Sequence, residues 1–242
     1  MSRYFNPKGE VSMPDHYQPK EVHIANMPSA EVRGDSPPSI VRPFITIAQQ
    51  IGAESSSLPH RLAEVLNHRN VHATQWSHWD QELIAKVSTE NQFPAELITS
   101  LETSGQSWVD SLLSGISGSH DEMIVFQCLK DVIRRLAAGG HVILVGHGST
   151  FMTRDLPAGL RVRLIAPTNF RIKALAMRFN CPLDEASRRM RRLDKQRSAF
   201  FGRFWPGRPL APDLFAAVLN AAELDEERLV QVIAAMLPFG RC

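Results

Sequence analysis

The segment HVILVGHGST, residues 141–150, decides the fold class of this chain. It is a short apolar run, typical of a buried strand, followed by a turn with two glycines. A similar run, FITIA, lies upstream at 44–48, and another, RVRLIA, lies downstream at 161–166. Amphipathic stretches separate these runs, and strands that alternate with helices indicate a parallel sheet with helices on both faces. The sequence therefore predicts a three-layer α/β fold.

The remaining elements follow from the same periodicities. Apolar residues at helical spacing predict helices, and one more short run predicts a last strand. The predicted helices span 58–66, 79–88, 94–103, 120–138, 168–179, 183 to about 201, and 225–237, and the last predicted strand spans 215–219.

Proline sets the first 43 residues apart, because they hold seven of the 16 prolines in the chain. Proline fixes φ and removes an N–H donor, which excludes a helix or a central strand here. Apolar residues still recur between the prolines, at Tyr4, Phe5, Met13, Tyr17, Val22, Ile24 and Met27. We predict an extended arm over 1–43 and one α/β domain over 44–242. The arm is expected to bind a protein partner, with packing on its own domain as the alternative.

Composition excludes several classes of protein. The chain has 242 residues, of which 43% are hydrophobic and 21% charged, as in an ordinary globular domain. No apolar run approaches the roughly 18 residues of a membrane-spanning helix, and the first ten residues lack the apolar core of a secretory signal. The three cysteines lie too far apart for a disulfide framework or a CxxC metal site. These features predict a cytoplasmic protein that does not bind membranes.

The loop after the first predicted strand has the position of a phosphate-binding loop. Residues 49–57 read QQIGAESSS and lead into a helix. Such a loop binds phosphate when glycines bring backbone N–H groups around the anion and a lysine joins them. This loop has one glycine and no lysine, and the carboxylate of Glu54 would repel a phosphate by a few kcal/mol at ~4 Å and an effective dielectric of ~20. The candidate nucleotide-binding residues are Gly52, Ser55, Ser56 and Ser57, and a plain serine cap of the helix is the alternative.

The turn Gly146-His147-Gly148 follows the second clear strand. Its glycines permit a sharp bend that exposes the side chain of His147. A neutral histidine can hydrogen-bond a ligand, but it holds phosphate less firmly than a bidentate arginine does, and a structural role is the alternative. His68, His72 and His78 have no acidic or thiol neighbours, so no metal site is expected.

The helix predicted from residue 183 is rich in arginine. Between Arg161 and Arg208 the chain has thirteen Lys and Arg against three acids, a net charge of +10, whereas the rest carries −8. Arginines three or four positions apart share a helix face, and Asp194 between them can hold guanidinium groups in place. Such a set suits a clamp on a polyphosphate during transfer, where charge stabilisation dominates. A solvated face and a protein–protein contact are the alternatives, and nucleic acid is not expected.

These segments resemble the cytidylate kinase-like family of P-loop proteins. The resemblance covers roughly 43–237, and its most specific part is GHGSTFMTRDLPAGLRVRLIAP at 146–167. The stretches at 78–83, 188–201 and 215–220 are also similar. The resemblance implies a nucleoside monophosphate kinase fold, whose active relatives move the γ-phosphoryl group of ATP to CMP or dCMP with magnesium. It places Asp80 and His147 near the acceptor, and it assigns the transfer clamp to Arg188, Arg191, Arg192, Asp194 and Arg197.

The sequence departs from the family pattern on both the donor and the acceptor side. The family's G-S-G-G loop reads Gly52-Ala53-Glu54-Ser55 here, and its G-R-G turn reads Gly146-His147-Gly148. Ala216 and Ala221 replace the usual Asp and Thr of the last strand. Losing one preorganised donor typically costs about 10²–10³ in rate. The sequence therefore favours a pseudoenzyme that acts as a subunit, scaffold or regulator in a protein assembly. The alternative is an active CMP/dCMP kinase, and only that alternative requires ATP and magnesium; a nucleotide or another phosphate is a candidate ligand of either.

Overall fold

The structure, a computed structural model, describes residues 42–69, 74–79, 120–146 and 148–237. Most of the arm, the helix expected over 94–103 and nearly all of the one expected over 79–88 lie outside the described residues. Two candidate acceptor-side residues, Asp80 and His147, lie outside them as well.

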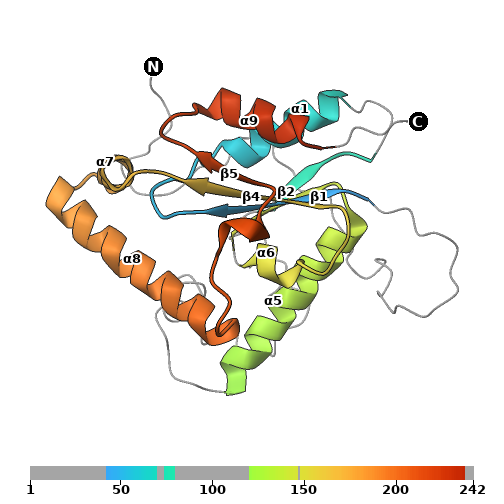
Figure 1. The fold of residues 1–242 in the computed structure, drawn as a ribbon, viewed down its shortest axis with the longest axis horizontal. Helices are drawn as coiled ribbons and strands as arrows, with labels where there is room; N and C mark the ends of the chain where they lie inside the picture. Colours follow the sequence, from blue (N-terminus) through green and yellow to red (C-terminus); the bar gives the residue numbers. More distant parts are fainter. Residues whose placement is uncertain (1–41, 70–73, 80–119, 147, 238–242) are drawn as a thin grey trace, which may run out of the picture. The chain divides into compact units, whose positions relative to one another are not determined.

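A parallel sheet in the order β2-β3-β1-β4-β5 forms the centre of the fold (Figure 1). The strands are β1 (Phe44–Gln49), β2 (Ser77–Trp79), β3 (Val142–Val145), β4 (Gly159–Ile165) and β5 (Ala217–Asn220). All six residues of the central strand β1 are buried, as expected for a parallel strand covered on both faces. Within the register, Ile45 lies opposite Ile143 of β3 and Leu160 of β4.

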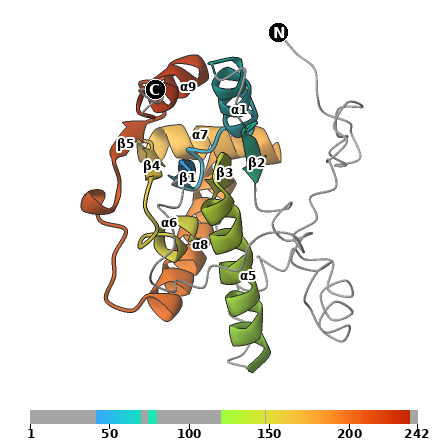
Figure 2. The same ribbon diagram turned by 90° about the vertical axis from the view of Figure 1, so that its right-hand side faces the viewer.

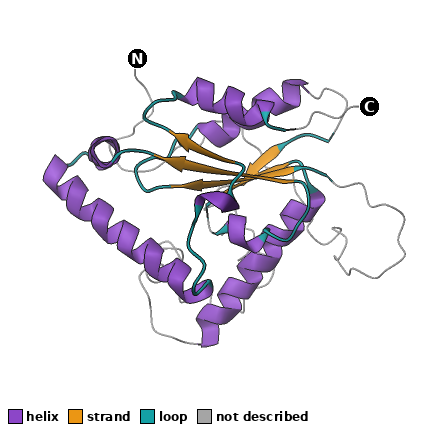
Figure 3. Ribbon diagram, in the orientation of Figure 1, coloured by secondary structure: helices purple, strands orange, loops and turns teal. Residues whose placement is uncertain are grey.

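Helices cover both faces of this sheet (Figures 1 and 3). On one side lie α1 (Leu58–Arg69) and α9 (Glu226–Ala235), and on the other lie α5 (His120–Gly139), α6 (Ser149–Met152) and α8 (Leu183–Phe204). The two sides are separated by the strands in the perpendicular view as well (Figure 2). After β4 the chain forms α7 (Thr168–Phe179), which packs against α8 through Leu175. The predicted three-layer α/β fold is thus confirmed.

The main hydrophobic core lies between the sheet and the α1/α9 layer. Its fully buried side chains include Ile45 and Ile47 of β1 and Leu62 of α1. Burying one such aliphatic side chain contributes about 1.5–3 kcal/mol. Alternate residues of a strand face opposite sides, so Thr46 faces the other layer, where its hydroxyl lies 3.1 Å from that of Thr150 in α6.

Two arginines fix the segment between α6 and β4. Arg134 of α5 donates to both carboxylate oxygens of Asp155, at 2.6 and 2.8 Å. These hydrogen bonds lower the pKa of Asp155 from 3.8 to about 2. Arg161 donates to the carbonyls of Thr153 and Leu156, at 2.6 and 3.1 Å. The guanidinium groups of Arg134 and Arg161 therefore hold the connection between α6 and β4 in place.

The element bounds differ from the predictions at a few places. A helix was expected from Trp79, but this residue ends strand β2 and lies opposite Leu144 of β3. Its side chain is only 6% exposed, so burial beside β3 outweighs the local helical pattern. The short helix α6 was not predicted, and β5 begins at Ala217 rather than at 215. None of the described helices is both long and apolar enough to cross a bilayer.

Candidate functional site

The candidate site lies at the edge of the sheet where parallel strands end. The carboxyl ends of β1, β3, β4 and β5 share this edge, and ligands of open α/β sheets bind there. Four connections meet at it, namely residues 50–57, 146–148, 166–167 and 221–225. The 50–57 loop follows the central strand and joins it to α1.

Gly52 is required in this loop by packing against α7. Its φ is +81°, and a Cβ added to it would lie 2.6 Å from the carbonyl oxygen of Arg171. A residue with a side chain would meet both the steric penalty of this φ and that contact. Packing against α7 therefore explains the single glycine of the loop without a bound phosphate.

The carboxylate of Glu54 occupies the loop itself. One of its oxygens lies 3.4 Å from the backbone nitrogen of Gly52 and 3.0 Å from a guanidinium nitrogen of Arg178. An anionic ligand of this loop would need the same backbone N–H and the same cation. The Arg178 side chain is 61% exposed, and a pair this open contributes at most about 1 kcal/mol to stability. This ion pair therefore adds little to stability, and the main effect of Glu54 is the negative charge that it places in the loop.

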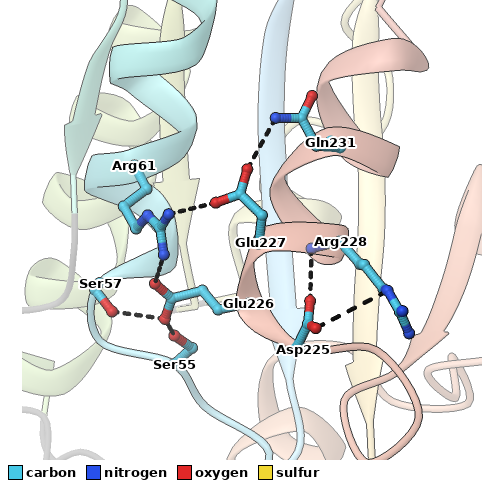
Figure 4. A network of polar contacts seen from close by, with 8 residues as sticks. All are labelled: Ser55, Ser57, Arg61, Asp225, Glu226, Glu227, Arg228 and Gln231. Carbon is cyan, nitrogen blue, oxygen red and sulfur yellow. Dashed lines mark hydrogen bonds and ion pairs between the residues drawn. The ribbon is translucent and has the colours of Figure 1, made fainter. Parts of the chain in front are cut away.

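Two of the candidate serines bind a carboxylate of α9 (Figure 4). Ser55 and Ser57 both donate to one oxygen of Glu226, the latter at 2.6 Å. Arg61 of α1 donates to the other oxygen at 3.2 Å and also binds Glu227. Burial alone raises the pKa of Glu226, but the hydrogen bonds from Ser55, Ser57 and Arg61 outweigh it and hold this pKa below its ordinary value. The two hydroxyls thus connect the start of α1 to α9, while Ser56 is exposed.

The same network fixes the first turn of α9. The carboxylate of Asp225 caps the helix by accepting from the backbone nitrogen of Arg228 at 2.9 Å, and Gln231 donates to Glu227 at 3.0 Å (Figure 4). Acidic residues in this position are favoured by the helix dipole.

An open pocket of about 480 Å³ lies between this turn and the 50–57 loop. Among its described lining residues, four are acids and one is a cation: Glu54, Glu223, Asp225, Glu226 and Arg228. Its apolar wall includes Phe170 and Leu229. The charge of this pocket disfavours a polyphosphate.

Two of the predicted clamp residues, Asp194 and Arg197, contact other elements than their own helix. Arg197 donates to the carbonyl of Gln49 at the end of β1, and burial lowers its pKa, an effect that nearby Glu54 opposes. Both oxygens of Asp194 lie 2.7 Å from one guanidinium nitrogen of Arg171. Arg171 is only 7% exposed and also donates to the carbonyl of Ile51 at 2.5 Å. The expectation that Asp194 holds arginines of its own helix is therefore wrong, because it pairs with α7.

Sequence reasoning missed Arg171. The signal available for it was its position on the buried stripe of α7, four residues before Leu175, which is 1% exposed. A cation on such a stripe needs a partner, since an unpaired buried charge is costly. The identity of that partner depends on how α7 packs against α8.

The other three clamp residues lie on exposed positions of α8. Arg188 pairs with Asp184 at 2.9 Å, and Arg191 donates to the hydroxyl of Ser187 at 2.9 Å. Arg192 is exposed and forms no hydrogen bond or ion pair with the described residues. The contacts of Arg188 and Arg191 keep these two side chains on their own helix. The structure therefore pairs two members of the predicted clamp with α7 and with the end of β1, and it leaves three on the surface.

The glycine turn on the acceptor side packs against an aromatic cluster. Gly146 and Gly148 both have positive φ, +76° and +71°. The ring of Trp205 lies directly over Gly148 and stacks on Phe151, with centroids 5.0 Å apart. The cavity beside this turn, which Arg197 also lines, measures about 10 Å³, room for roughly one water molecule.

Replacing Gly148 with alanine is expected to destabilise the protein by about 2–4 kcal/mol, measured by urea unfolding. Alanine at this position is strained by the positive φ, and its Cβ collides with the ring of Trp205. Gly146→Ala is the matched control, because Gly146 has a similar φ but no atom of the described residues within 4 Å of an added Cβ. It should cost only about 1–2 kcal/mol. Equal losses in the two variants would show that Trp205 does not restrict the turn.

The loop residues do not fit a magnesium-bound triphosphate. Glu54 already accepts from Gly52 and Arg178, and Glu226 accepts from Ser55 and Ser57. Within the described parts of the chain, no group of three or more His, Cys, Asp or Glu side chains is placed to hold a metal ion.

Comparison with known proteins agrees with the fold. The model of the cytidylate kinase-like family matches residues 44–223, about three quarters of the chain. No curated protein matches. An uncharacterized protein from Eubacterium ventriosum aligns with a TM-score of 0.56 and 14% identity, over 81% of this chain and 98% of that one. A shikimate kinase from Bacteroides thetaiotaomicron (TM-score 0.45, 13% identity, 81% and 96% covered) and a gluconokinase from Sinorhizobium meliloti (0.46, 14%, 81% and 92%) align less closely.

Proposed function

The chain belongs to the cytidylate kinase-like family, and from this premise we propose that it is a catalytically impaired member that acts as a subunit, scaffold or regulator in a protein assembly. One observation carries the proposal. The carboxylate of Glu54 lies 3.4 Å from the Gly52 nitrogen and 3.0 Å from Arg178, within the loop that would hold the donor phosphates.

Phosphoryl transfer depends on positioning and on stabilising negative charge in the transition state. A fixed carboxylate in the donor loop opposes both the binding of the phosphates and the charge that develops during transfer. The loop hydroxyls of Ser55 and Ser57 are engaged by Glu226, and Arg197 is engaged by the Gln49 carbonyl. Nucleotide binding would have to break these contacts before it could use the same groups.

The acceptor side supports the same proposal. The family arginine of the G-R-G turn is replaced by His147, and Trp205 packs over the neighbouring Gly148.

The proline-rich arm is the proposed tether to a partner chain. Its apolar side chains between prolines suit an extended segment that orders on another surface. A protein that keeps the family scaffold, carries a glutamate in its donor loop and has such an arm is better suited to assembly than to catalysis.

A phosphoryl-transfer assay tests the proposal. The protein is incubated with magnesium, ATP and either CMP or dCMP, beside an active cytidylate kinase as a positive control. We expect no ADP above the level without protein. Turnover in the range of about 1–100 per second, typical of kinases, would contradict the proposal and establish the active kinase instead.

A further inference from the structure

We propose that the exposed ridge of α8 formed by Arg188, Arg191, Arg192 and Lys195, here named the α8 ridge, docks an acidic segment of a partner protein. The inference rests on the proposed function, because it names the chemistry of a partner for a protein that acts in an assembly. All four side chains are exposed, and they recur at helical spacing on the side of α8 opposite its buried residues Ala186 and Met190.

Three of the four cations have no carboxylate partner in the described part of the chain. Arg188 pairs with Asp184, and both side chains are well exposed. Arg191 donates to the neutral hydroxyl of Ser187, and neither Arg192 nor Lys195 forms an ion pair with a described residue. The ridge therefore presents unneutralised positive charge to its surroundings.

Two other arginines of the described surface are paired with carboxylates. Arg61 binds Glu226 and Glu227, and Arg134 binds Asp155. On the ridge, by contrast, cations lie three or four positions apart, a spacing at which like charges destabilise a helix. A carboxylate-bearing partner would remove this penalty.

The rest of the chain favours a short acidic polypeptide over an extended polyanion. The segment 161–208 carries a net charge of +10, but the remainder carries −8. A nucleic acid or an anionic membrane would extend beyond the ridge and meet this opposing charge, whereas contacts within a Debye length of about 8 Å act locally. Arginines also match carboxylates well, because one guanidinium can donate to both oxygens.

The test uses the full chain and a fluorescent oligo-glutamate peptide of about twelve residues, read by anisotropy at about 50 mM salt. The variant Arg191→Glu/Arg192→Glu should raise the Kd at least about tenfold. The control is Arg135→Glu/Arg154→Glu, two exposed arginines on α5 and after α6, which change the net charge equally and should shift the Kd less than about twofold. Binding by the wild type should weaken steeply at about 500 mM salt.

Several outcomes would overturn the inference. One is no binding of the peptide by the wild type, which would leave the ridge as a solvated face. Equal losses of peptide affinity in the two double variants would show that binding depends only on the net charge of the protein. Tighter binding of a single-stranded thymidine oligomer, or of vesicles containing phosphatidylserine, would assign the ridge to a different partner class. The phosphoryl-transfer assay reports separately on catalysis, so a failure of the ridge and a failure of the proposed function remain distinguishable.

Discussion

The Glu54→Gly protein is expected to bind ATP at least about tenfold more tightly than the wild type does. A carboxylate and a phosphate charge about 4 Å apart repel each other by about 4 kcal/mol at an effective dielectric of ~20. The Glu54 side chain is 26% exposed, so solvent weakens this repulsion but does not remove it. The substitution also releases Arg178 and the Gly52 N–H for the anion. Calorimetric titration with ATP and magnesium measures the change.

Two further variants separate charge from backbone freedom. Glu54→Gln keeps the shape of the side chain and removes its charge, so it should reproduce most of the gain. Glu64→Gln removes the same charge from an exposed position of α1, where the glutamate pairs with His60, and should leave ATP affinity unchanged. No gain in either Glu54 variant would refute the role assigned to this carboxylate.

Asp194→Ala is expected to lower the free energy of unfolding by about 3 kcal/mol in urea denaturation. The substitution leaves the guanidinium of Arg171, 7% exposed, with the Ile51 carbonyl as its remaining partner in the described structure. Removing one partner of a buried ion pair typically costs about 3–5 kcal/mol, and the 39% exposure of Asp194 places this pair at the lower end.

Asp184→Ala is the control on the same helix. It removes an ion pair with Arg188 whose side chains are 70% and 65% exposed, so the loss should stay below about 1 kcal/mol. The double variant Arg171→Met/Asp194→Leu should recover most of the stability, because it removes both charges together. If Asp194→Ala were no more destabilising than Asp184→Ala, the ion pair with Arg171 would not hold α7 and α8 together.

The sheet was predictable because strands that are buried on both faces consist of consecutive apolar residues, a pattern that is visible in the local sequence. The runs at 44–48 and 141–145 are apolar without alternation, as strands covered on both faces must be, and they correspond to β1 and β3. Strand β2 has three residues and depends on its pairing with β3, so the local pattern around Trp79 could not indicate it. The short helix α6 likewise has too few residues to show a helical repeat of apolar positions.

The candidate site was predictable only in part. The sequence alone identified Glu54 as a residue of the wrong charge for a phosphate loop. Its cationic partner, Arg178, lies 124 positions away, and the carboxylate that binds Ser55 lies 171 positions away. Such pairs depend on how helices pack at the sheet edge, and a single sequence carries no local signal for them. The same limit applies to the pairing of Asp194 with Arg171.

The central claim is that the loop after β1 is occupied by its own carboxylate and does not hold a nucleoside triphosphate. Calorimetric titration of the wild-type protein with ATP in excess magnesium tests it most directly. The account predicts no saturable binding up to about 1 mM ATP, the upper end of ordinary enzyme affinities for substrates. A dissociation constant in the micromolar range, about 1–10 μM, would contradict it.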